Sequence, residues 1–288
     1  MPLVPKAASL VVMAILAGIA VGAAVFALQS WTLEDMHVYL DAARRLREGE
    51  TLYSTTNPLA AYQYAPWFAA AWVPLTFLPE TMVAVAWSGV LVVASFISVR
   101  PLLKRRSAPE LALALLMLPI LLFSSARSGN VQPLLIAGLV IGLERRWGPL
   151  AIAAAASLKA FPLALALVYL GRGDWRRFTM AVGLTGLLAT PMLFFDLARY
   201  TVDGARAGTL YNISPLAWAA PVAGLVAVTI GLAWRRSAHT WLAAAATVVM
   251  GLPRMLSYDM SFLLVGTTIS PAGSADDERT AEPRKPGS

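Results

Sequence analysis

The chain has 288 residues, of which 58% are hydrophobic and only 14% are charged. Soluble domains carry about 25% charged residues, and a soluble core of this length could not bury so much apolar surface, so the composition indicates an integral membrane protein. The net charge of +7 does not indicate a nucleic-acid partner, because most basic residues fall in short loops beside apolar runs. With no cysteine, and with its two histidines (His37 and His239) far apart, the sequence predicts no disulfide, no metal site and no cofactor.

The first part of the chain predicts one membrane span followed by a polar loop. Residues 7–29 are apolar and long enough to cross a bilayer as a helix; lacking a clear cleavage site, they are interpreted as a retained anchor. Residues 30–80 form the first loop. Within it, the helical period of 32–46 predicts an amphipathic helix on the membrane surface. The apolar segment 66–79 is too short to span and predicts a helix lying in the interface.

The rest of the chain predicts a series of membrane helices in a single domain, residues 1–270. Apolar segments predict spans at 81–99, 110–125, 131–143, 178–195, 216–234, 241–253 and 260–270. Residues 149–170 are expected to break into two short helices at Lys159, because a lysine in mid-bilayer costs about 3 kcal/mol or more. The sequence therefore predicts an all-α polytopic membrane protein with about ten transmembrane helices, several of them short. The tail, residues 271–288, is rich in Pro, Gly, Ser and charge and predicts a disordered cytoplasmic segment.

The distribution of charge predicts which loops lie outside the cytoplasm. With the N-terminus inside, every inner loop between helices carries at least two basic residues, as the positive-inside rule requires. The outer side then collects a set of isolated charges, which are Asp35, Arg127, Lys159, Arg199, Arg206, Arg254 and Asp259. A loop with carboxylates that faces several cations indicates a site for an anionic lipid head group with a base nearby.

Several short motifs resemble a known family in their order and spacing. They are Asp35-Met36-His37-Val38-Tyr39, Leu52-Tyr53, Tyr64-Ala65-Pro66, Gly129-Asn130-Val131-Gln132, Ser157-Leu158-Lys159-Ala160-Phe161-Pro162 and the stretch from Arg254 to Asp259. Together they resemble the polyprenyl-phosphate-mannose-dependent mannosyltransferases of glycosyltransferase family 87, across nearly the whole chain except the tail. The resemblance implies a GT-C-type helical fold with outer juxtamembrane helices.

The resemblance also implies an activity. It is the transfer of mannose from polyprenyl-phosphate-mannose to a glycolipid or glycan acceptor on the extracytoplasmic face of the cell membrane. The reaction would invert the anomeric carbon, would need no metal or cofactor, and would use one carboxylate as general base.

Asp35 is the expected base, because it begins the outer helix and matches the family's position. The alternative is that Asp35 only caps this helix in a Thr32-x-x-Asp35 box, and Glu34 is the second choice of base. Lys159 is the expected ligand of the donor phosphate, since a lysine at a helix break inside a membrane needs an anionic partner. The alternatives are a structural pair with Asp259 or a lysine that extends its charged end toward the membrane surface.

Other residues extend the expected site. Arg127, Arg206 and Arg254 are candidates for the donor phosphate, or are solvated loop charges. Candidates for binding the sugar or the acceptor are Tyr39, Tyr62, Tyr64, Asn130, Gln132, Tyr258 and Asp259. The aromatic residues near 62–72 also fit an interfacial belt, in which Tyr and Trp are common.

Two rival functions have different sequence requirements. A flippase or transporter of lipid-linked sugars is expected to show inverted repeats and polar sites at mid-membrane on broken helices. No clear halves are visible, and the polar residues gather at the outer face. A non-catalytic membrane scaffold would not need an acidic loop that faces a cationic rim.

Overall fold

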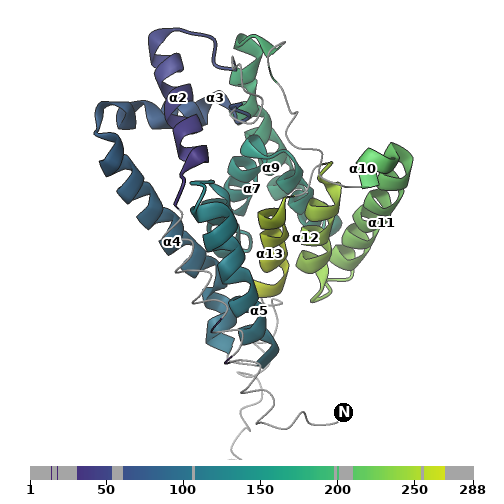
Figure 1. Ribbon diagram of the computed structural model, residues 1–288. Helices are drawn as coiled ribbons and strands as arrows, with labels where there is room; N and C mark the ends of the chain where they lie inside the picture. Colours follow the sequence, from purple (N-terminus) through teal and green to yellow (C-terminus); the bar gives the residue numbers. More distant parts are fainter. Residues whose placement is uncertain are drawn as a thin grey trace, which may run out of the picture.

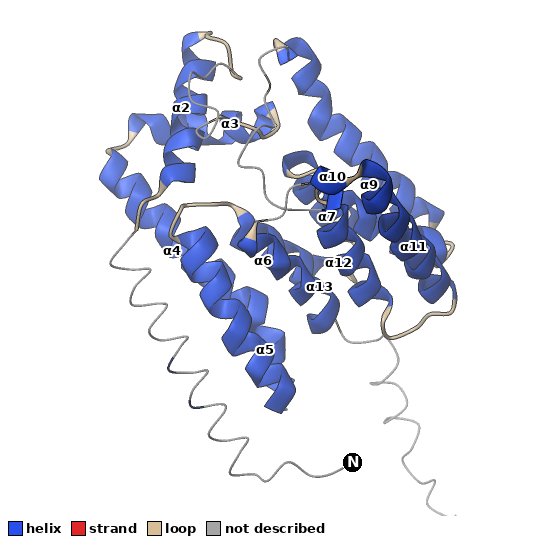
Figure 2. Ribbon diagram, turned by 45° about the vertical axis from the view of Figure 1, so that its right-hand side comes forward, coloured by secondary structure: helices blue, strands red, loops and turns tan. Residues whose placement is uncertain are grey.

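The computed structural model describes residues 31–53, 61–105, 108–197, 200, 210–253 and 256–269, together with Ala14 and Gly18. These residues form helices and connecting turns without a strand (Figures 1 and 2). Most of the expected first span, the tail, Arg199, Arg206 and Arg254 lie outside the described residues.

The helices follow the predicted order along the chain. Their bounds are α2 Glu34–Glu48, α3 Pro66–Trp72, η2 Val73–Phe77, α4 Glu80–Arg105, α5 Ala108–Pro119, η3 Ile120–Ala126, α6 Gln132–Gly142, α7 Gly148–Leu158, η4 Phe161–Ala166, α8 Leu167–Gly171, α9 Trp175–Ala189, η5 Thr190–Phe194, α10 Leu210–Ile213, α11 Pro215–Trp234, α12 Thr240–Gly251, η7 Ser257–Phe262 and α13 Leu263–Thr268. Each apolar segment predicted after residue 80 is helical over most of its described part. The protein is an all-α polytopic membrane protein.

Four helical stretches among the described residues are long and apolar enough to cross a membrane by themselves. They are Glu80–Lys104, Pro109–Ala126, Trp175–Phe194 and Pro215–Trp234. The other apolar helices are shorter, as expected of helices that end inside the protein. The predicted break at Lys159 is confirmed: α7 ends at Leu158, Lys159 has a non-helical backbone (φ −144°, ψ 79°), and η4 begins at Phe161.

The first loop folds onto the helical bundle. The buried face of α2, which includes Met36, Tyr39 and Leu40, packs against α3 and η2, so protein rather than lipid covers it. The predicted amphipathic helix is therefore observed, with its apolar face covered by α3 and η2, and its position at the membrane surface stays a prediction. The helix stands upright above the bundle, and the segment of α3 and η2 lies across it (Figures 1 and 2).

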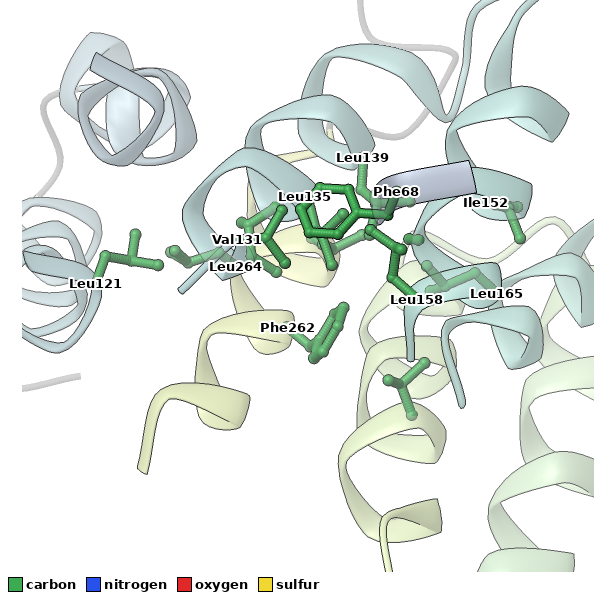
Figure 3. Packing of buried hydrophobic residues seen from close by; sticks show 14 of the residues in the cluster. Phe68, Leu121, Val131, Leu135, Leu139, Ile152, Leu158, Leu165, Phe262 and Leu264 are labelled. Carbon is green, nitrogen blue, oxygen red and sulfur yellow. The ribbon is translucent and has the colours of Figure 1, made fainter. Parts of the chain in front are cut away.

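A hydrophobic core joins the first loop to the helices of the bundle. Phe68 of α3 belongs to the same buried cluster as Val131, Leu135 and Leu139 at the start and along one side of α6, and as Leu158 of α7 (Figure 3). Burial of a side chain of this size stabilises the fold by about 1.5–3 kcal/mol. The core therefore ties the first loop to the turns at the adjacent end of the bundle.

Helix ends lie alternately at two ends of the bundle. The end near α2, here called the site end, carries the turns at 127–131, at Lys159 and at 256. The opposite end carries the turns at 143–147, 172–174 and 235–239, which hold Arg145, Arg146, Arg172, Arg235 and Arg236. This division of charge favours an inner location for the opposite end.

The charge bias predicts the sidedness of the chain. Because the protein has no cysteine, single cysteines can be introduced at Glu50, near the site end, and at Lys104, near the opposite end. We expect an impermeant thiol reagent to label Glu50→Cys in intact cells and Lys104→Cys only after permeabilisation. The reverse labelling pattern would contradict this orientation.

Candidate active site

The site end is built on a turn that follows a π-helix. In η3, Ile120–Ala126, hydrogen bonds span five residues: Arg127 N–H donates to Leu122 O (3.0 Å), and Asn130 N–H donates to Ser125 O (2.9 Å). The turn then reverses at Gly129, which has φ +78°. Such short π segments occur frequently at functional sites, because the wider coil changes the direction of the residues that follow.

The turn docks onto the start of α2 through its backbone. Arg127 O accepts hydrogen bonds from Thr32 N–H (3.2 Å) and Leu33 N–H (3.0 Å), and Ser128 O accepts one from Asp35 N–H (2.7 Å). These carbonyl groups satisfy N–H groups that a helix start leaves unpaired. The N-cap residue is Leu33 (φ 51°), without a side-chain cap, so the alternative in which Thr32 and Asp35 form a capping box is wrong.

The same turn holds the Asp35 carboxylate. Ser128 Oγ–H donates to Asp35 Oδ2 at 2.8 Å, and Asn130 Nδ2 donates to the same oxygen at 3.1 Å. Gln132 N–H donates to Asn130 Oδ1 (2.9 Å), which fixes the orientation of that amide. Among the described residues, Asp35 Oδ1 accepts no side-chain hydrogen bond. A partly buried carboxylate with one oxygen left open can act as a general base.

Tyr64 lies within electrostatic reach of two carboxylates, those of Asp35 and Asp259. Its hydroxyl oxygen is 3.3 Å from the Tyr39 hydroxyl and 3.5 Å from Asn130 Nδ2. Burial and the charge of Asp35 raise the pKa of the Tyr64 hydroxyl above its usual value, and Asp259 adds to this rise, although the two hydrogen bonds oppose it. Tyr64 therefore stays protonated at neutral pH and can donate a hydrogen bond at the site.

Two other predicted tyrosines are buried. The Tyr39 ring packs against Phe68 and Trp72, with ring centroids 5.0 and 5.2 Å apart, and its hydroxyl accepts from Val131 N–H at 3.3 Å. The Tyr62 hydroxyl donates to Ala65 O at 3.0 Å. In this structure both residues fix the first loop to the bundle, and their binding of sugar or acceptor stays a prediction.

Lys159 and Asp259 form a second polar group at the site end. Lys159 Nζ is 3.3 Å from Asp259 Oδ1 and 4.4 Å from the centre of the Tyr258 ring. Asp259 Oδ2 also accepts from Leu256 N–H at 2.9 Å. The exposed fractions of the two charged side chains are 14% and 5%, so the pair is shielded from water. The alternative of a structural pair is therefore observed, and a role of Lys159 toward phosphate stays a prediction.

Three side-chain hydrogen bonds join the remaining motifs. Ser257 Oγ donates to Ser124 Oγ (3.1 Å), Gln132 Nε2 to Ser261 Oγ (3.2 Å), and Trp67 Nε1 to Ser157 Oγ (3.0 Å). The segments around residues 35, 64, 130, 159 and 259 thus meet at one end of the bundle. Gln132 itself is fully buried. The guanidinium group of Arg127 lies 5.2 Å from the centre of the Phe123 ring.

Ser128 is the site residue that the sequence did not single out. It lies between Arg127 and the Gly129-Asn130 motif, and these predicted neighbours were the only indication of its role in the sequence.

Within the described residues, no group of three or more His, Asp and Glu side chains is placed to hold a metal ion.

A comparison with protein-family models matched residues 62–202 to glycosyltransferase family 87. This match, together with the apolar helices, supports a membrane glycosyltransferase of family 87. The matched range includes Tyr64, Ser128, Asn130 and Lys159 of the site. The comparisons with curated proteins and with solved structures gave no match.

The docking of the turn onto α2 predicts a strict need for glycine at position 129. A Cβ there would lie 2.9 Å from Met36 Cβ and 3.0 Å from Met36 N, whereas a Cβ at Gly173, which also has a positive φ (+74°), meets nothing within 4 Å. Both Gly129→Ala and Gly173→Ala carry the strain of a left-handed backbone, about 1–2 kcal/mol. We expect Gly129→Ala to lower the thermal unfolding temperature in detergent clearly more than Gly173→Ala, because it also displaces α2. Equal shifts would contradict the close approach.

Proposed function

We propose that this protein transfers mannose from polyprenyl-phosphate-mannose to a glycolipid or glycan acceptor. The proposed reaction takes place on the extracytoplasmic face of the cell membrane and inverts the anomeric carbon, in a GT-C-type fold. The observation that carries the proposal is the Asp35 carboxylate, whose Oδ2 is held by the turn at 127–130 and whose Oδ1 receives no side-chain hydrogen bond from the described residues. The resemblance of the first loop to the family's mannosyltransferases supports the choice of donor.

In the proposed step, the acceptor hydroxyl oxygen attacks the anomeric carbon from the side opposite the phosphate. Its proton passes to Asp35, and the bond between the anomeric carbon and the phosphate oxygen breaks. The electron pair of that bond leaves with the polyprenyl phosphate. One displacement accounts for inversion, and a phosphate leaving group needs cations or N–H donors rather than a general acid.

Lys159 is proposed to bind the donor phosphate, with Arg127, Arg206 and Arg254 as further candidates. The partly enclosed Nζ of Lys159 lies in a region of low water content, where a phosphate oxygen interacts with it more strongly than in bulk water. Because Asp259 already neutralises Lys159, the phosphate must compete with this carboxylate or share the lysine with it. Tyr64 and Tyr258, both partly buried, are proposed to contact the sugar or the acceptor.

An apolar groove between α4 and α6 supports the proposal that the donor is linked to a lipid. It has a volume of about 490 Å³ and is lined by small and aliphatic side chains, among them Gly89, Val93, Ala137 and Gly138. It begins two residues after Trp87, whose indole N–H donates to Gly129 O at 2.8 Å. The groove thus starts close to the turn that holds Asp35 and can accommodate part of a prenyl chain.

The proposed function predicts that Asp35→Asn abolishes most turnover. Asparagine keeps the shape of the side chain but cannot take the proton, and a general base contributes about 10²–10⁴-fold in rate. We expect a folded protein that still binds the donor and has at least about 100-fold lower activity. The assay incubates purified protein with radiolabelled polyprenyl-phosphate-mannose and a membrane lipid extract.

Glu34→Gln is the matched control, because the exposed Glu34 precedes Asp35 in the same helical turn. It should retain nearly normal activity. If Asp35→Asn stays active while Glu34→Gln is inactive, the base has been assigned to the wrong carboxylate. If the wild type transfers mannose and both variants do so equally well, the mechanism fails.

A further inference from the structure

The hydrogen bonds to Asp35 are distributed unequally between its two oxygens. Ser128 Oγ and Asn130 Nδ2 both donate to Oδ2, at 2.8 and 3.1 Å, and the described residues place no side-chain donor on Oδ1. Ser128 also donates to Ser125 O at 3.0 Å in an alternative orientation of its hydroxyl. Two donors on one oxygen restrict rotation of the carboxylate about its Cβ–Cγ bond.

The orientation of Asn130 follows from its own contacts. Its Oδ1 accepts from the buried N–H of Gln132, so its amino group must face Asp35 Oδ2 and the Tyr64 hydroxyl. Rotation of the amide by 180° would place an acceptor against the carboxylate and would leave the Gln132 N–H group unpaired, which is costly in a buried position. The donor that Asn130 offers to Asp35 is therefore set by the backbone of α6.

We propose that Ser128 and Asn130 are positioning residues for the general base, and that they make Oδ1 of Asp35 the atom that accepts the acceptor's proton. This inference rests on the proposed function. It gives Asn130 a role that differs from the predicted binding of sugar or acceptor: the residue acts through Asp35. A reacting group that is misplaced by about 1 Å can lose about 100-fold in rate, so the constraint has a kinetic consequence.

The backbone contacts separate this role from a purely structural one. Ser128 docks α2 with its carbonyl group, which accepts from Asp35 N–H at 2.7 Å, and Ser128→Ala keeps that bond. The variant removes only the hydroxyl donor to Oδ2. If Ser128→Ala has normal stability, any loss of activity therefore reflects a change in the orientation of the Asp35 carboxylate.

The test is a double-mutant cycle with Asp35→Asn in the mannose-transfer assay. We expect Ser128→Ala and Asn130→Ala each to lower kcat by about ten-fold, within the loss that misplacement can cause, with an unchanged KM for polyprenyl-phosphate-mannose. Ser128→Thr keeps the hydroxyl group and should retain most activity. In an Asp35→Asn background, neither alanine substitution should lower the residual rate further, because groups that act through one another are not additive.

Ser95→Ala is the matched control, since among the described residues this buried hydroxyl in α4 donates to Leu91 O, within its own helix. It should leave kcat unchanged. Losses that add fully to that of Asp35→Asn, or a raised donor KM with normal kcat, would overturn the positioning role while leaving the proposed function intact. Absence of transfer by the wild type would overturn both. If Asn130→Ala does not fold, Ser128→Ala and its cycle decide the question.

Discussion

The contact between the start of α2 and the turn at 127–130 determines the geometry of the whole site end. Carbonyl groups of Arg127 and Ser128 take up N–H groups of α2, and the absence of a side chain at Gly129 lets the two backbones approach. This docking places Asp35 against residues that lie 93 and 95 positions later in the chain. Backbone contacts thus place Asp35 beside the turn, and the side chains of Ser128 and Asn130 orient its carboxylate.

The membrane environment explains why the site end is rich in paired polar groups. Where helices end inside apolar surroundings, unpaired charges and N–H groups cost several kcal/mol each. The break at Lys159 is accordingly matched by Asp259, and Asp259 in turn satisfies Leu256 N–H at the start of η7. In the proposed function, this pair would offer the anionic donor a cation that is already in place. The Lys159–Asp259 pair, which stabilises the helix break, is thus also the proposed site of phosphate binding.

Much of the fold follows from local properties of the sequence. Helix positions depend on apolar length, and the break at Lys159 depends on the cost of a lysine in lipid, so both could be predicted. The contact partners of α2 could not, since an amphipathic helix packs as well on protein as on a membrane surface. The roles of Ser128 and Asn130 depend on a π-helical turn and on contacts between distant segments, which a residue pattern does not encode. The Lys159–Asp259 pair was the alternative to phosphate binding by Lys159, and it is observed. Asp35 was chosen as base mainly from the family resemblance, and its catalytic role stays a prediction.

The most direct test of the account is a cryo-electron microscopy structure of the Asp35→Asn protein with polyprenyl-phosphate-mannose, whose slow turnover should preserve the donor. The account predicts that the sugar lies at the site end with its anomeric carbon facing residue 35 across a space large enough for an acceptor hydroxyl. It also predicts that the phosphate contacts Lys159. A donor whose phosphate and sugar are bound at the opposite end of the bundle, or away from both residues, would contradict it.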